Sequence, residues 1–400
     1  MIRLKDTRYQ NTAAFLDSAI RVAEYYGFSP LESIPRAPRE PKRNPAAVFK
    51  DSDIAFARRD ERTLPSAARK CLAAVRPPHG TLLAWRTVNS TAGIPGISLE
   101  LHVMGASSTI AEALLIVVAT AIAEEAGIAD RVLSINNIGA PDSCGRFVRD
   151  VGLYLRKHIE SITPTLRPRA AEDPLGTLVQ LIERGHPAVS RAPQAMEYLT
   201  EEERHRFWEL LEYLEVVGLP YELSGQILGS RDCWSHSLFD LSTIDQETGS
   251  PIPIAFGGRY DPLASRFAQT PMSAAMVSVS IESRGKTVLL KRQVPAAPLM
   301  YFAYLGMEAR RKSLGVLETL RRASIPVHQG LWYDRIGDQM AAARDLATPY
   351  ILIMGHKEAM DGTVIVREVA TNSQEDVPVP DLANYLKRHR IAPWQAAVNA

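Results

Sequence analysis

Apolar and polar residues alternate strictly over residues 97–104. This period of two predicts a half-buried β-strand with one apolar and one polar face. The apolar run that follows, Ala113 to Ala123, is 11 residues long, whereas a membrane-spanning helix needs about 20. We therefore expect a buried core helix over 109–126, ended by Gly127. The polar face of the strand carries Ser98, Glu100 and His102.

The rest of the first 295 residues mixes helical and strand patterns. Helical spacing of apolar residues predicts a helix over 12–28, and residues 131–158 predict a strand followed by a helix. From about 165 to 220 the chain is helical and charge-rich, and Thr200 with Glu203 forms a capping-box pattern. Short strands between turn signals favour an α+β domain built on an antiparallel sheet. The strand signals lie at 238–241, 252–256, 275–282 and 287–291.

After residue 295 strands alternate with helices of 10–15 residues, a pattern typical of βαβ units and a largely parallel sheet. This change predicts two domains, 1–295 and 296–400. The expected strands lie at 299–306, 325–330, 350–355 and 362–371, and the expected helices at 307–323, 336–347 and 380–389.

Composition narrows the class of protein. Hydrophobic residues make up 46% and charged residues 23%, which excludes a largely disordered chain. Lys and Arg number 46 against 45 for Asp and Glu, which excludes an overall basic coat for nucleic acid. The three cysteines and nine histidines show no metal-binding spacing, so we expect neither a disulfide framework nor a metal site. Without an N-terminal apolar stretch or a membrane segment, the expected location is the cytoplasm.

Two stretches near the C-terminus, LETLRRASIPV and DQMAAARDLATPYILIMGHKEAMDGTVIVRE, carry a specific pattern, with Gly355 and Glu358 in a turn before the last hairpin. They resemble the anticodon-binding domain that histidyl, glycyl, threonyl and prolyl class II tRNA synthetases share. The resemblance implies an α/β domain that takes tRNA or another structured RNA. Such domains receive splayed bases at the edge of a sheet, where aromatic or arginine planes stack on them.

Three stretches of the core resemble the histidyl-tRNA synthetase family in particular. They are LSINNIGAPDSCGRFVRDVGLYLRKH at 133–158, the helical insertion at 172–223, and AFGGRYDPL at 255–263. The resemblance implies a class II synthetase core that forms a homodimer. If the core is active, the resemblance implies that it uses ATP and Mg²⁺ with histidine and tRNA.

The motifs that carry the chemistry of that family are altered here. Where the family has Phe-Arg-x-Glu, the chain reads Trp-Arg-Thr-Val, which keeps Arg86 and loses the carboxylate at Val88. Its histidine-specific motif aligns with 229–234 and replaces the catalytic arginine by Gly229. The γ-phosphate arginine becomes Ser283, unless Arg284 substitutes after a shift of register. Each lost arginine costs about 2.7–4 kcal/mol of transition-state stabilisation, so little adenylation is expected.

Three function hypotheses follow from the resemblance. The first is a synthetase-like protein with a degenerate adenylation site that binds tRNA or structured RNA. The second is an active histidine–tRNA ligase whose phosphate contacts fall to Arg86, Arg231, Arg259 and Arg284. The third is a histidine-sensing regulatory subunit like that of ATP phosphoribosyltransferase, against which the C-terminal domain argues, because that family usually lacks it.

The candidate residues form three sets. Arg86, Arg231 and Arg284 are the residual catalytic positions, although a structural ion pair is as good an interpretation of Arg86. The substrate pocket is expected to hold Ser98, Glu100, His102, Arg259 and Tyr260, of which the last two also suit a role in fastening the Gly-Gly-Arg-Tyr turn. The RNA-binding set is Arg310, Arg311, Arg321, Arg322, Trp332, Tyr333 and Arg335, which solvated helix faces and loop packing would also explain. No DNA or membrane partner is expected.

Overall fold

The computed structural model describes residues 1–37, 50–58, 60–76, 80–89, 95–245, 248–283 and 298–389. The chain divides into two compact units. Unit 1 comprises Met1–Ile20, Phe28–Leu210 and Pro220–Leu289, and unit 2 comprises Arg21–Gly27, Leu211–Leu219 and Leu290–Ala400. The predicted strand at 287–291 and the predicted domain boundary near residue 295 lie outside the described residues.

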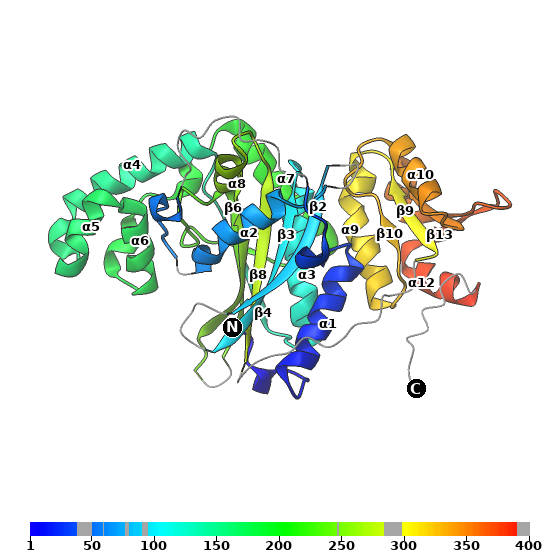
Figure 1. The fold of residues 1–400 in the computed structure, drawn as a ribbon, viewed down its shortest axis with the longest axis horizontal. Coiled ribbons are helices and arrows are strands. Elements are labelled where there is room, and N and C mark those ends of the chain that lie inside the picture. The colour runs from blue at the N-terminus through cyan, green and yellow to red at the C-terminus, as the bar shows by residue number, and fades with distance from the viewer. Residues whose placement is uncertain are drawn as a thin grey trace. The chain divides into compact units, whose positions relative to one another are not determined.

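An eight-stranded sheet forms the centre of the described part of unit 1, with strand order β1-β2-β3-β8-β7-β6-β4-β5 (Figure 1). Its inner pairs are antiparallel, and only the pairs β1–β2 and β4–β5 at its two edges are parallel. The predicted α+β class is therefore confirmed. The strands are β1 Ser29–Pro30, β2 Leu82–Asn89, β3 Gly96–Met104, β4 Arg131–Asn137, β5 Glu222–Leu223, β6 Ser235–Ile244, β7 Pro251–Arg259 and β8 Ala274–Glu282.

Strand β3 departs from the sequence prediction in one respect. It lies in the interior of the sheet between β2 and β8, so nearly all of its side chains are buried, including those of the polar face. Glu100 is 1% exposed and His102 is fully buried. Alternation alone predicted a face in contact with water, but the segments that cover this face turn it into a polar interior. Buried polar groups need hydrogen-bond partners, and these define the candidate site.

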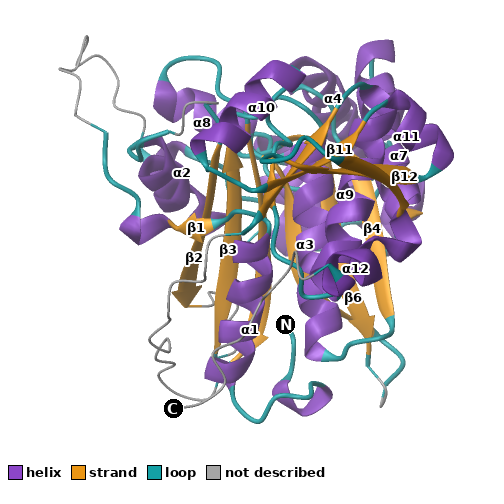
Figure 2. Cartoon of the chain, turned by 90° about the vertical axis from the view of Figure 1, so that its right-hand side faces the viewer, coloured by secondary structure: helices purple, strands orange, loops and turns teal. Residues whose placement is uncertain are grey.

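Helix α3, Ile110–Ala126, is the predicted core helix and is confirmed. It contacts β6, β7 and β8, and Figure 2 shows it lying along the strands of this sheet. Its end is set by Gly127, whose φ of 90° falls in the left-handed region that glycine adopts without strain. The other helices of the first 220 residues are α1 Thr12–Tyr25, α2 Leu64–Leu72, α4 Pro141–Lys157, α5 Arg167–Glu172, α6 Pro174–Glu183 and α7 Glu201–Val217, and α8 Asp261–Ala268 follows β7.

The capping box predicted before α7 is present. The Oγ1 atom of Thr200 accepts a hydrogen bond from the backbone N–H of Glu203 at 3.3 Å, and the Glu203 carboxylate accepts one from the backbone N–H of Thr200 at 2.7 Å. The same carboxylate accepts hydrogen bonds from the backbone N–H of Ala140 and the hydroxyl of Ser143 at the start of α4. One side chain thus fixes the beginnings of two helices.

Unit 2 contains a five-stranded sheet in the described residues, with strand order β10-β9-β11-β12-β13. The pairs β10–β9 and β9–β11 are parallel, whereas β11–β12 and β12–β13 are antiparallel. The expectation of a largely parallel sheet is therefore wrong for the last two strands, because the short helix α11 and the β12–β13 hairpin replace a second crossover. The elements are β9 Met300–Tyr304, α9 Met307–Arg322, β10 His328–Gln329, α10 Ile336–Asp345, β11 Tyr350–Met354, α11 His356–Asp361, β12 Thr363–Glu368, β13 Gln374–Pro378 and α12 Val379–Arg388.

None of the helices within the described residues is both long enough and apolar enough to cross a membrane. All three cysteines are free and buried.

Candidate functional site

Arg86 on β2 lies opposite Glu100 on β3, and the two side chains form a buried ion pair. The Nε atom of Arg86 donates to a carboxylate oxygen of Glu100 at 2.6 Å, and the side chains are 3% and 2% exposed. Arg86 Nη2 also donates to the backbone carbonyl of Thr63 at 2.9 Å. The Arg86 guanidinium therefore binds partners within unit 1, in agreement with the interpretation of Arg86 as a structural ion-pair residue.

Glu100 is the centre of a longer polar chain. Its second carboxylate oxygen accepts the hydroxyl of Thr63 at 2.7 Å, and Nε2 of His102 lies 3.4 Å from the oxygen that Arg86 contacts. Nδ1 of His102 lies 3.2 Å from the hydroxyl of Tyr260. Burial raises the pKa of Glu100, but the His102 hydrogen bond and the Arg86 charge outweigh burial and lower that pKa to about 2. Burial lowers the pKa of His102.

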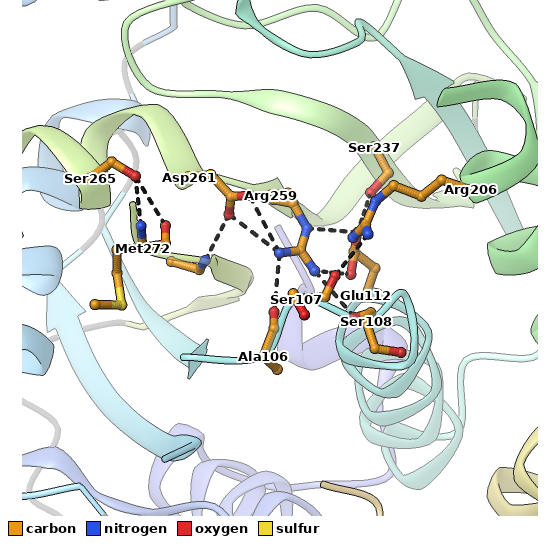
Figure 3. A network of polar contacts seen from close by, with 11 residues as sticks. Ala106, Ser107, Ser108, Glu112, Arg206, Ser237, Arg259, Asp261, Ser265 and Met272 are labelled. Carbon is orange, nitrogen blue, oxygen red and sulfur yellow. Dashed lines mark hydrogen bonds and ion pairs between the residues drawn. The ribbon is translucent and has the colours of Figure 1, made fainter. Parts of the chain in front are cut away.

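Arg259, at the end of β7, is held by protein groups through all three of its guanidinium nitrogens (Figure 3). Nε and Nη2 donate to the two carboxylate oxygens of Glu112 on α3, at 2.9 and 2.6 Å. Nη1 donates to the carbonyl of Ala106 and to Asp261, and Nη2 donates also to the carbonyl of Ser108. All five N–H groups of the guanidinium therefore have acceptors. With 1% exposure, Arg259 fastens the Gly-Gly-Arg-Tyr turn to the core helix.

Glu61 joins the segment before α2 to the loop at 229–234. Its carboxylate accepts the backbone N–H groups of Ala57, Arg58 and Ser230 and the indole N–H of Trp234, at 2.8–3.0 Å. The side chains of Glu61 and Trp234 fill the space beside Gly229. A Cβ atom at position 229 would lie 2.5 Å from Cδ1 of Trp234 and 2.8 Å from Oε1 of Glu61. Position 229, which the sequence analysis aligns with a catalytic arginine, thus excludes even a methyl group unless its neighbours move.

Two of the cavities in the described part of unit 1 are lined by predicted site residues. The larger, of about 610 Å³, is lined by Ser98 and Glu100 of the predicted substrate pocket. His102, Arg259 and Tyr260 are not among its lining residues, and Arg86 lies beneath Glu100. Arg231 lines a second cavity of about 290 Å³ instead. Arg284 lies outside the described residues.

The larger cavity is also lined by four arginines that sequence reasoning did not select: Arg58, Arg62, Arg169 and Arg184. The run Arg-Arg-Asp-Glu-Arg at 58–62 was the available signal, but a charge run does not by itself reveal whether it faces a cavity or bulk water. In the described residues no group of three or more His, Cys, Asp or Glu side chains is arranged to hold a metal ion.

In unit 2 an ordered loop follows β10, at residues 331–335. The Tyr304 hydroxyl donates to the carbonyl of Tyr333 at 2.8 Å, and the buried Gln339 amide bridges the Tyr304 backbone and the same carbonyl. Trp332 is half-buried, and its indole N–H has no hydrogen-bond partner in the described part of the chain. Arg335 is exposed, and Arg310 on α9 reaches the loop through an ion pair of 3.3 Å with Asp334.

The predicted RNA-binding set is therefore split. Arg310 and the 331–335 loop lie together, whereas Arg322 is 12 residues further along α9, which is about 18 Å at 1.5 Å per residue. Arg321 and Arg322 both pair with Glu318, and Arg321 is 9% exposed. Arg311 pairs with Glu308 and Glu212. Within the predicted set and the described residues, Arg310 and the 331–335 loop are the members that lie together.

Known proteins match both units of the chain. A family model described as the anticodon binding domain matches residues 300–389. A histidine–tRNA ligase of Thermosynechococcus vestitus is 27% identical over 295 residues, covering 73% of this chain and 68% of the relative. A histidine–tRNA ligase of a Cyanothece strain is 27% identical over 299 residues, covering 74% and 69%. The apo structure of S. aureus histidyl-tRNA synthetase has a TM-score of 0.49 at 16% identity, covering 94% of this chain and 95% of that one.

The antiparallel core sheet followed by an anticodon-binding domain is the architecture of a class II aminoacyl-tRNA synthetase. Over about 70% of its length the chain is similar to histidine–tRNA ligases, at 27% identity to the two named above and 22% to one of a Geobacillus strain.

Proposed function

We propose that this chain is a histidyl-tRNA synthetase-like protein that binds tRNA or a structured RNA through unit 2 and does not form histidyl-adenylate. The observation that carries the proposal is the Arg86–Glu100 pair. Adenylation needs an arginine on the α-phosphate of ATP, because negative charge builds on oxygens that no side chain can protonate. Here the candidate arginine is buried and bound to a carboxylate at 2.6 Å.

Two further positions support the loss of adenylation. Gly229 stands where the family has its catalytic arginine, and the side chains of Trp234 and Glu61 occupy the adjacent space. Arg259 has no N–H group left for a phosphate, because Glu112, Asp261 and two carbonyls accept all five. For Arg86 or Arg259 to contact a phosphate, each would have to leave its present carboxylate partner.

The test for chemistry is histidine-dependent exchange of pyrophosphate into ATP. We expect background exchange with the full chain, and no change on Arg86→Lys, which preserves the positive charge toward Glu100. Robust exchange by the parent protein that Arg86→Lys reduces would reject the proposal and establish an active ligase.

The second candidate function is an active histidine–tRNA ligase with divergent motifs, using ATP, Mg²⁺, histidine and tRNA. The observation that favours it is the set of relatives, which are histidine–tRNA ligases matched over about 70% of this chain. In that case Arg86 would have to leave Glu100 when ATP binds, and the four arginines of the larger cavity would be available nearby. Tight histidine binding, measured by calorimetry, together with background exchange would instead indicate a histidine-sensing regulatory subunit.

The RNA surface is proposed to be the 331–335 loop with Arg310. Trp332 offers a half-buried ring, Arg335 is exposed, and Arg310 reaches the loop through its ion pair with Asp334. Binding should weaken with salt, because phosphate contacts release counterions. Trp332→Ala and Arg335→Ala should each weaken tRNA binding, by about 1–3 kcal/mol for a lost stack. Arg367→Ala, on the hairpin strand β12, is the control, and equal binding by all three variants would remove the loop from the proposal.

We also propose a homodimer in the cytoplasm, as the class II resemblance implies. Light scattering that gives about the monomer mass of 44.1 kDa at micromolar concentration would contradict the dimer.

A further inference from the structure

We infer that the larger cavity of unit 1 is a binding site for a small polyanion without an aromatic base, a ligand that carries two or more phosphate or carboxylate groups. The inference deepens the proposed function, because it names the ligand class of the cleft that no longer carries adenylation. It rests on arginines that lie outside the three altered motifs and on the hydroxyl and apolar residues that line the rest of the cavity.

The charge of the cavity is positive among the described residues that line it. There, four arginines stand against two carboxylates, Glu100 and Glu183, and Glu100 is already bound to Arg86. Arg169 is paired with Asp173 at 2.7 Å. Arg62 and Arg184 are exposed, and no ion-pair partner for either lies within the described residues. Two uncommitted guanidinium groups at the rim of one cavity attract an anion and present forked donors to it.

The floor supplies hydroxyl groups. Ser98 on β3 and Ser280 on β8 are cross-strand neighbours whose Oγ atoms lie 3.3 Å apart, and Ser278 lies two residues away on the same face. Hydroxyl groups can donate to phosphate or carboxylate oxygens without adding a competing negative charge. The rim and the floor therefore suit the same ligand, which has several oxygens and a compact shape.

The wall offers a base few ring faces for stacking. Two phenylalanines line the cavity, Phe56 in the segment before α2 and Phe256 on β7, and the guanidinium carbon of Arg58 lies 3.8 Å from the centre of the Phe256 ring. This cation–π contact covers one face of the Phe256 ring, so a base cannot stack on that face while Arg58 stays in place, and Phe56 is left as the ring that the test with adenosine probes. The neighbouring wall residues Pro253 and Ile254 offer apolar surface without a ring face for stacking.

The test is calorimetry on the full chain in EDTA, so that no metal ion links the anion to the protein. The probes are inorganic diphosphate, inorganic triphosphate, citrate, ATP and adenosine. We expect diphosphate or citrate to bind, adenosine to show no binding, and ATP to bind no more than about threefold tighter than triphosphate. If diphosphate binds more tightly than citrate, phosphate is the preferred group, and if citrate binds more tightly, carboxylate is. Adenosine binding, or a tenfold preference for ATP, would overturn the inference in favour of a nucleotide site.

Variants assign the site. Arg62→Gln and Arg184→Gln should each weaken binding of the preferred anion about tenfold, the effect of one lost charge-assisted contact. Arg204→Gln, an exposed arginine of α7 that does not line the cavity, is the control and should bind as the parent does. Parental affinity in the Arg62→Gln/Arg184→Gln double variant, or no anion binding by the folded parent, would refute the inference. Histidine-dependent exchange would refute only the proposed loss of adenylation, so the two failures are distinguishable.

Discussion

The Nε atom of Arg86 lies 2.6 Å from the carboxylate of Glu100, across adjacent strands of the core sheet, with both side chains almost fully buried. The two residues face each other in the register of β2 and β3, so the backbone pairing itself brings them together. In a synthetase core, an arginine on this strand that is to bind ATP must reach the cleft. A buried carboxylate directly opposite holds it in the sheet instead.

Breaking this pair from one side should be costly. We expect Arg86→Met to lower the free energy of unfolding by about 3–5 kcal/mol, because it leaves the Glu100 charge buried without its cation. Adding Glu100→Gln should recover a large part of that loss, since the remaining group is neutral. Arg204→Met is the control, because Arg204 pairs with Glu201 at the surface and such pairs contribute about 0–1 kcal/mol. Urea unfolding measures all of these, and an Arg86→Met loss as small as the control's would show that the pair is not structural.

Two glycine-to-alanine substitutions should change the free energy of unfolding in opposite directions. Gly229→Ala places a Cβ atom 2.5 Å from the Trp234 ring and should lower stability by about 1–3 kcal/mol through overpacking. Gly145→Ala, within α4, places a Cβ atom with no neighbour inside 4 Å and should raise stability by about 0.5–1 kcal/mol through lower backbone entropy. Thermal or urea unfolding tests both. A tolerated alanine at 229 would mean that Trp234 can move aside, and would reopen this position to a larger side chain.

Glu61 should be among the more sensitive positions of unit 1. It accepts four N–H groups and is 1% exposed. Glu61→Ala should therefore lower the free energy of unfolding by about 3 kcal/mol or more, because buried donors lose a charged acceptor. Glu61→Gln keeps one acceptor oxygen and should fall between the parent and Glu61→Ala. Equal stability of the glutamine variant and the parent would show that the charge contributes nothing.

His236 should make the protein sensitive to mild acid. Burial, with the charges of Arg206 and Arg259, lowers its pKa from 6.5 to about 4. The unfolded chain takes up a proton near pH 6.5 and the folded chain resists it, so stability falls as the pH drops from about 6.5 to 4. His236→Asn should reduce the stability difference between pH 7 and pH 5 by about 2 kcal/mol.

Asparagine is the chosen replacement because His236 has a φ of 53°, and asparagine tolerates this left-handed conformation. His205→Asn, on the exposed surface of α7, is the control. If the free energy of unfolding falls by the same amount in His236→Asn and in the parent between pH 7 and pH 5, other groups cause the acid sensitivity.

Periodicity in the sequence was enough to predict most elements of both units. The strand at β3, the core helix α3 with its glycine stop, the Thr200–Glu203 capping box and the elements β9, α9, α10 and β11 are present as expected. These features depend on neighbours within a few residues, and local spacing records such interactions directly. The short α11 and β13 were missed, because their patterns extend over too few residues to stand out.

The sequence by itself determined the resemblance of this chain to histidyl-tRNA synthetases and the motifs in which it differs from them, since motifs are read from residue types in order. The tertiary structure decided where those residues point. The polar face of β3 is buried, Arg86 pairs with Glu100, and Arg259 pairs with Glu112. Side chains fill the space beside Gly229. Arg62 and Arg184, which are more than 100 residues apart in the sequence, line the same cavity. The physical reason is that burial and ion pairing depend on contacts between distant segments. A one-dimensional pattern contains the charges of such residues but not their partners.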